Sequence, residues 1–135
     1  MQINPYLFYN GNCAEAFDYY AKVLGGTIEA KMTYADAPAD MPMPPEDRAK
    51  VMHASMRIQG QVLMASDAPA QRFHTPQGFA VSLQYADPAE GERIFTALAE
   101  GGSVGMPYGV TFWSKGFGMC TDRFGIPWMV NCPAD

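Results

Sequence analysis

Residues 12–26 read NCAEAFDYYAKVLGG, and residues 87–102 read DPAEGERIFTALAEGG. Each stretch opens with a residue that can cap a helix, continues with apolar residues at helical spacing and closes on two glycines. In both stretches a Glu follows the capping residue by three positions, which is the spacing of a capping box. The chain is therefore predicted to contain two similar helices, capped by Asn12 and Asp87 at an offset of 75 positions.

Strand signals surround both helices in the same order. Near the ends of the two halves, Gly60 with Met64 matches Gly125 with Met129, an offset of 65 residues. The shorter offset reflects an extra proline-rich segment around residues 36–46, which we interpret as a mobile surface loop, either a lid or a disordered excursion. The expected strands are 3–9, 27–34, 51–58 and 61–66 in the first half, and 78–85, 103–111, 113–121 and 126–132 in the second.

This order predicts an α+β fold made of two βαβββ units, with repeat units at about 1–67 and 77–135. Neither unit has enough surface for a closed core. We therefore expect a cupped, eight-stranded mixed sheet with the helices on its outer face.

Composition limits the classes of function. The chain has 135 residues and 48% hydrophobic content, as expected for a single globular domain spanning residues 1–135. A net charge of −5 with nine scattered Lys and Arg residues argues against a nucleic-acid partner. No apolar run approaches the ~18 residues of a membrane span, and the first residues lack a signal peptide's basic region. We therefore expect no membrane partner. Three cysteines without CxxC spacing indicate reduced thiols, so we expect a cytoplasmic protein.

Short sequence motifs are distributed along the whole chain. They are PYLF at 5–8, NG at 10–11, AFDYY at 16–20, MHA at 52–54, LMASD at 63–67, FW at 112–113 and TDRFGIPW at 121–128. With these motifs the whole chain resembles the vicinal oxygen chelate superfamily of glyoxalase I, bleomycin-resistance proteins and extradiol dioxygenases. It is more specifically similar to the PhnB-like branch, labelled 3-demethylubiquinone-9 3-methyltransferase-like. The resemblance implies a homodimer, with residues 67–76 as a possible crossover between exchanged units.

The resemblance also implies four metal-binding positions, on the first and last strands of each unit. Carried over to this chain, they fall on Pro5, Met64, Ala80 and Met129. None of these offers the oxygen or imidazole donors that hard cations and zinc require. A shift of one residue gives Asn4, Leu63, Phe79 and Trp128, which do not make a site either. We therefore expect no metal and no cofactor.

The same positions predict which strand residues face a ligand, because side chains alternate along a strand. A mostly apolar face with a few hydroxyl and amide groups is typical of a small-molecule site. The opposite set, Tyr6, Phe8, Val81, Leu83 and Tyr85, is expected to pack under the helices. Trp113 is interpreted either as core or as a ring that stacks on the ligand, and Lys115 either as solvated or as favouring an anionic group. The face predicted to line the pocket comprises Leu7, Tyr9, Met64, Ser66, Ser82, Gln84, Met129 and Asn131.

His53, on an expected strand, is the candidate catalytic residue. It can be a structural or pocket-polar histidine, a ligand-binding or acid–base group, or a metal ligand. Cys120 and Cys132 lie in apolar strands, where thiols stay protonated and inert. The candidate ligand-binding residues are Tyr9, His53, Met64, Ser66, Ser82, Gln84, Trp113 and Met129.

Three functions follow, and whether the chain is an enzyme stays open. The preferred hypothesis is a protein without the superfamily metal that binds a small organic molecule, aromatic or amphipathic, in the sheet cavity. The second is an enzyme of altered chemistry that uses His53. The third, 3-demethylubiquinone methyltransferase activity, is disfavoured, because no Gly-rich turn of the GxGxxG type follows a strand and no nucleotide-binding sheet is indicated.

Overall fold

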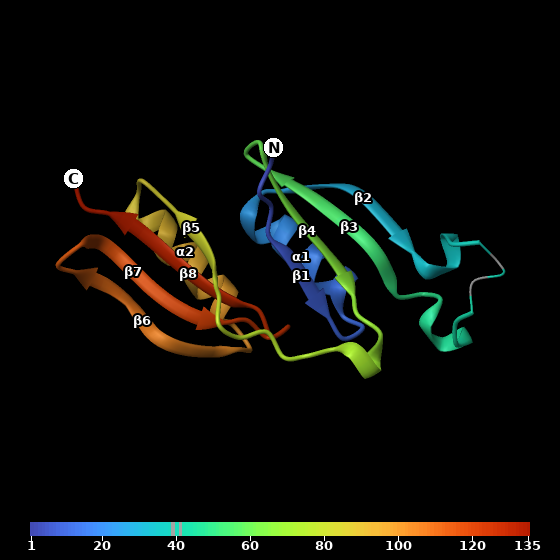
Figure 1. Cartoon of the computed structure of the whole chain (residues 1–135). Coiled ribbons are helices and arrows are strands. Elements are labelled where there is room, and N and C mark those ends of the chain that lie inside the picture. Colours follow the sequence, from blue (N-terminus) through green and yellow to red (C-terminus); the bar gives the residue numbers. More distant parts are fainter. Residues whose placement is uncertain (39, 41) are drawn as a thin grey trace. The chain divides into compact units, whose positions relative to one another are not determined.

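The computed structural model describes residues 1–38, 40 and 42–135. The chain forms two compact units, Met1–His74 and Thr75–Asp135 (Figure 1). Each unit contains one α-helix and one four-stranded mixed sheet. The predicted α+β fold of two βαβββ units with eight strands is therefore confirmed, with the strands distributed over two four-stranded sheets.

In the first unit, β1 is an edge strand that pairs with β4, the last strand of that unit. The strand order is β1-β4-β3-β2, in which β1 runs parallel to β4 and the other neighbours are antiparallel. The extra segment between β2 and β3 holds two short 3-10 turns, Tyr34–Asp36 and Pro45–Asp47. The elements are β1 (Tyr6–Tyr9), α1 (Cys13–Leu24), β2 (Thr27–Thr33), β3 (Val51–Ile58) and β4 (Gln61–Asp67).

The second unit repeats this topology without the extra segment. Its strand order is β5-β8-β7-β6, again with one parallel pair, β5 with β8. In the part of the chain that is described, no helix is long and apolar enough to cross a membrane. The elements are β5 (Val81–Gln84), α2 (Pro88–Ala99), β6 (Ser103–Thr111), β7 (Ser114–Thr121) and β8 (Pro127–Pro133).

Each helix covers one face of the sheet in its own unit. The apolar residues of α1 that the spacing predicts are buried, among them Phe17, Tyr20 and Leu24, and in α2 so are Ile94 and Leu98. Alternate residues of the last strands lie beneath the helices, so the opposite face of each sheet has no helix on it. We call the two uncovered faces open faces.

The starts of the two helices differ. Asp87 caps α2 as predicted, because its carboxylate accepts a hydrogen bond of 3.0 Å from the Ala89 N–H. At α1 the prediction of a cap by Asn12 is wrong, since this side chain makes no cap bond and its Oδ1 is buried without a partner. The buried Asp67, from the end of β4, accepts instead from Cys13 N at 3.0 Å, and this contact is one that local spacing does not reveal.

The strand registers correct the predicted face of β1. Tyr6 pairs with Met64, whereas in the second unit Ser82 pairs with Met129. The first strands are thus offset by 76 residues and the helices by 75. The reason is that three residues (10–12) lie between Tyr9 and α1, whereas two (86–87) lie between the equivalent Tyr85 and α2. A shift of one residue moves every side chain of a strand to the other face of its sheet.

The prediction that Leu7 and Tyr9 lie on the pocket face of the sheet is therefore wrong. Each is only 1% exposed, and the Tyr9 hydroxyl donates to that of Tyr20 in α1 at 3.0 Å. Tyr6 and Phe8, which were expected under the helix, are 38% and 52% exposed on the open face. Tyr9 consequently belongs to the core of the first unit and does not belong to a ligand site on this face.

Candidate functional site

The open face of the first unit gathers three rings and two smaller side chains. Tyr6 lies opposite Met64, and Phe8 lies opposite Ser66, in the pairing of β1 with β4. His53 comes from β3 and reaches Tyr6 across the sheet. We call the set Tyr6, Phe8, His53, Met64 and Ser66 the first open face.

The rings of the first open face contact one another. The Tyr6 hydroxyl and His53 Nδ1 are 3.1 Å apart, within hydrogen-bond distance, and their ring centroids are 5.8 Å apart. The Tyr6 and Phe8 centroids are 5.1 Å apart. Exposed, adjacent rings of this kind offer stacking area to a planar ligand, and the imidazole adds one polar group.

The open face of the second unit is built mainly from neutral polar groups. Asn131 Nδ2 donates to Gln84 Oε1 at 2.9 Å, and Gln84 Nε2 donates to Ser82 Oγ at 3.0 Å. Phe117 lies opposite Asn131, and Met129 lies opposite Ser82. We call these five residues the second open face. The amide ladder fixes the orientation of both amides, and Asn131 Oδ1 stays buried without a hydrogen-bond partner.

Trp113 lies in the turn between β6 and β7 and is 44% exposed. Its ring meets Phe117 edge-on at 5.4 Å and Phe112 at 4.9 Å. Trp113 thus contacts a residue of the second open face, and its stacking on a ligand stays a prediction. Lys115 forms an exposed ion pair of 3.0 Å with Asp135, which raises the pKa of the lysine through their hydrogen bond.

The metal that the superfamily resemblance implies does not fit the residues present. Met64 and Met129 lie on the two open faces, and the corrected register places Tyr6 and Ser82 beside them. Thioethers are too soft for hard divalent cations, and neutral hydroxyls are weak replacements for carboxylate or imidazole. Within residues 1–38, 40 and 42–135, no group of three or more His, Cys, Asp or Glu side chains could hold a metal ion.

The thiols are poor nucleophiles. Burial, with a smaller contribution from Asp67, raises the pKa of Cys13 to about 12. Burial and Asp122 raise the pKa of Cys120 to about 11. Cys132 is fully buried and donates its S–H to the Ala86 carbonyl at 3.2 Å. Thiols that remain protonated at neutral pH do not attack a substrate efficiently.

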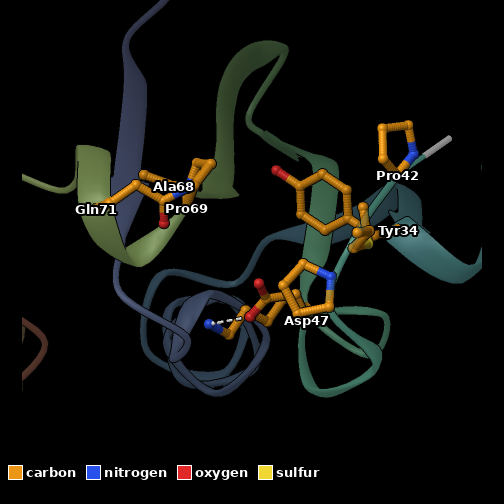
Figure 2. A pocket seen from close by; sticks show the side chains of 9 residues that line it. Tyr34, Pro42, Asp47, Ala68, Pro69 and Gln71 are labelled. Carbon is orange, nitrogen blue, oxygen red and sulfur yellow. Dashed lines mark ion pairs between the residues drawn. The ribbon is translucent and has the colours of Figure 1, made fainter.

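A small pocket of about 130 Å³ lies beside the extra segment of the first unit. Figure 2 shows Tyr34 on one side and Ala68, Pro69 and Gln71 on the other. The Tyr34 hydroxyl donates to the Asp67 carbonyl at 3.0 Å. Sequence reasoning did not anticipate this pocket. Because sites for organic ligands measure roughly 300–1,000 Å³, the open faces are the stronger candidates. The other lining residues are Pro42, Met43, Pro44, Asp47 and Lys50, the last two joined by an ion pair of 2.8 Å.

Of the predicted ligand-binding residues, the structure brings His53, Met64 and Ser66 together on the first open face. Ser82, Gln84 and Met129 lie on the second, beside the ring that Trp113 contacts. Sequence reasoning missed Tyr6, Phe8 and Phe117. A signal for Tyr6 and Phe8 was available in the sequence, because three residues (10–12) follow the expected strand 3–9 before its helix, whereas two (86–87) follow the expected strand 78–85.

Comparisons with known proteins agree with this architecture. A family model described as 3-demethylubiquinone-9 3-methyltransferase matches residues 1–131. Protein YjdN of Escherichia coli (strain K12) is 36% identical over 143 residues, covering 97% of this chain and 95% of that protein.

Solved structures extend the likeness to three dimensions. The crystal structure of protein PA1353 from Pseudomonas aeruginosa is 49% identical, with a TM-score of 0.90 over 100% of this chain and 99% of that one. A PhnB protein from Bacillus cereus is 23% identical and shares the fold, with a TM-score of 0.81 over 97% of this chain and 98% of that one. The fold is also shared by a glyoxylase/bleomycin resistance protein/dioxygenase domain from Frankia sp. EAN1pec, which is 13% identical with a TM-score of 0.65 over 99% of this chain and 98% of that one. The chain therefore belongs to the PhnB-like family, the 3-demethylubiquinone-9 3-methyltransferase family by its model's description.

Proposed function

We propose that this protein binds a small organic molecule against its open faces and does so without the superfamily's metal. The observation that carries the proposal is the first open face, where Tyr6 and Phe8 expose their rings beside a hydrogen-bonded His53. Exposed, contiguous aromatic rings on a sheet are unfavourable in water unless they have a partner to bind. The combination of apolar rings and a few polar groups matches the usual character of a small-molecule site.

The second open face supports the same proposal. Its ladder of Ser82, Gln84 and Asn131 is neutral and oriented by hydrogen bonds of 2.9–3.0 Å. Fixed amides are common specificity groups, because a ligand that fails to match them leaves polar atoms unpaired. We therefore expect a ligand of the second open face to be uncharged where it contacts these amides.

The methyltransferase activity named in the family model's description is a second candidate. A cofactor of the S-adenosylmethionine type is commonly held at the carboxyl edge of a doubly wound parallel sheet beside a Gly-rich turn. Over the described residues, each sheet has a single parallel pair of strands. Saturable binding of S-adenosylmethionine in calorimetry would favour methyltransferase activity. Absence of such binding would favour a protein that binds a small organic molecule without this cofactor.

A screen of thermal stability against a library of uncharged aromatic and amphipathic compounds tests the proposal. We expect some compounds to raise the Tm, because a ligand that binds only the native state stabilises it. Phe8→Ala is expected to diminish that shift, whereas Val110→Ala, at an exposed position on β6, should leave it unchanged. If no compound raises the Tm, or if Phe8→Ala has no effect on any shift, the proposal fails.

Elemental mass spectrometry provides an independent check. Protein purified without chelator or affinity metal should carry far less than one divalent ion per chain, because the open faces lack hard donors. Stoichiometric metal that is lost on Met64→Ala or Met129→Ala would contradict the proposal and favour a metalloenzyme.

A further inference from the structure

We propose that Tyr6 and His53 together form a hydrogen-bond donor site for a carbonyl-type oxygen on a planar ligand. The inference rests on the proposed function and adds to it the chemical class of the ligand. Three observations carry it: the contact between the two side chains, a second imidazole nitrogen with no hydrogen-bond partner among the described residues, and the adjoining ring surface.

The first observation is the contact between Tyr6 and His53 Nδ1 at 3.1 Å. One partner donates and the other accepts. A phenol O–H is a stronger donor than a neutral imidazole N–H, and an unprotonated ring nitrogen is a stronger acceptor than a phenol oxygen. The favoured arrangement therefore has Tyr6 donating to Nδ1.

The direction of this hydrogen bond determines whether the other ring nitrogen, Nε2, carries a proton. In a neutral imidazole whose Nδ1 accepts, the proton resides on Nε2. Within the described part of the chain, Nε2 of His53 has no hydrogen-bond partner. The pair therefore presents an oriented N–H donor on the open face, and the complementary ligand group is an acceptor oxygen.

The surroundings of the pair indicate a neutral and planar ligand. Phe8 is 52% exposed and its ring lies 5.1 Å from that of Tyr6, so flat surface adjoins the donor. Two charged residues of the same sheet, Arg57 on β3 and Glu29 on β2, pair with each other at 3.1 Å. A ketone or ester conjugated to a ring accepts from the N–H donor through its oxygen and stacks on the ring surface through its own ring. A carboxylate gains no ion pair with Arg57, because Glu29 already pairs with that residue.

Two probes of nearly equal shape test the inference in calorimetric titrations. 2-Acetylnaphthalene carries a conjugated carbonyl, and 2-ethylnaphthalene has a methylene group in its place. We expect the acetyl compound to bind roughly fivefold more tightly to the unaltered chain, the size of one neutral hydrogen bond. Equal affinities would overturn the inference while leaving the proposed function in place.

Three variants separate the donor from the ring surface. His53→Phe should bring the ratio of the affinities for the acetyl and ethyl compounds close to one. Phe is the chosen replacement because the second unit carries Phe117 at the equivalent strand position. Tyr6→Phe should lower this ratio without a large loss of affinity for the ethyl compound. Phe8→Leu should lower the affinity for both probes and preserve the ratio. A ratio that survives His53→Phe would overturn the inference.

The tautomer is open to direct measurement by ¹⁵N NMR of the histidine side chains. The chain has two histidines, so a His74→Gln variant assigns the remaining signals to His53. We expect a protonated Nε2 and an unprotonated Nδ1 in the neutral ring, and partial loss of that preference in Tyr6→Phe. A neutral ring protonated mainly on Nδ1 would overturn the inference. If neither probe binds at 1 mM the inference also fails, and the library screen alone then decides the proposed function.

Discussion

The two open faces occupy equivalent strand positions and carry nearly opposite chemistry. The first offers rings on its edge strand β1 and an imidazole on β3. The second has polar side chains on β5 and a buried ring on β7. By strand pairing, the equivalent residues are Tyr6 and Ser82, Phe8 and Gln84, His53 and Phe117, Met64 and Met129, and Ser66 and Asn131.

This difference shows that topology and site chemistry obey different constraints. The helix face of each sheet has to be apolar and closely packed, so both units retain large buried side chains there. The open face has no such requirement within its own unit, and its residues are free to specialise for a ligand. Only the methionine pair, Met64 and Met129, is the same on both faces.

A second contrast lies at the helix starts. The α1 start depends on Asp67, whose carboxylate binds Gly11 N at 2.9 Å, Cys13 N at 3.0 Å and Val51 N at 2.8 Å. The α2 start depends on the neighbouring Asp87 alone. One carboxylate therefore joins a loop, a helix and two strands in the first unit, whereas the second unit uses a local cap.

The largest expected effect follows from this contrast. Asp67→Ala removes a 2% exposed carboxylate and leaves three backbone N–H groups without their acceptor. We expect a loss of about 3–5 kcal/mol in the free energy of unfolding, measured by urea denaturation. Asp67→Asn, which retains one acceptor oxygen, should cost less. A loss no greater than that of Asp87→Ala would refute the distinction between the two helix starts.

The packing beneath the helices sharpens the comparison. Gly118 of β7 is equivalent to Ala54 of β3, but a Cβ at Gly118 would lie 2.7 Å from Cε1 of the buried Phe95. We expect Gly118→Ala to destabilise the chain by about 1–3 kcal/mol, since the ring has to move. Gly109→Ala is the control, because a Cβ there meets no atom within 4 Å. Equal melting temperatures for the two variants would contradict this account of the packing.

Stability at alkaline pH tests the environment of Cys13. This residue opens α1, where the helix normally lowers a thiol pKa, yet burial and Asp67 raise the pKa to about 12. Between pH 9 and 12 the folded state retains the proton that the unfolded state loses, so stability falls as the pH rises. From pH 8 to pH 10 the unaltered chain should lose about 1 kcal/mol more than Cys13→Ala. Identical pH slopes would contradict the raised pKa.

The smallest contrast concerns the two predicted caps. Asp87→Ala should cost about 1 kcal/mol, because it removes the bond to Ala89 N. Asn12→Ala should change stability by less than about 0.5 kcal/mol, because its side chain makes no cap bond and has an unpaired buried oxygen. Chemical denaturation of both variants provides the check. A cost for Asn12→Ala that matches Asp87→Ala would restore the capping role that the sequence pattern suggests.

Much of the fold could be predicted because its signals are local. Helical spacing, paired glycines and alternating apolar runs identified both helices and all eight strands, with shifts of a few residues at their ends. The faces of β5 and β8 also followed from alternation, and Ser82 and Gln84 lie opposite Met129 and Asn131. The predicted face of β1 was wrong, because Tyr9 is one residue further from its helix than the equivalent Tyr85 is, and local propensity does not register such an insertion.

The sequence by itself determined the doubled βαβββ pattern, the family and the scarcity of hard metal donors at the superfamily's positions, because each depends on residue type and local order. The tertiary structure alone decided that Asp67 replaces Asn12 at the start of α1, since that contact joins residues more than 50 positions apart. It also decided that Tyr6, and not Tyr9, meets His53. The physical reason is that strand pairing sets which side chains share a face, and pairing partners in this fold come from distant parts of the chain.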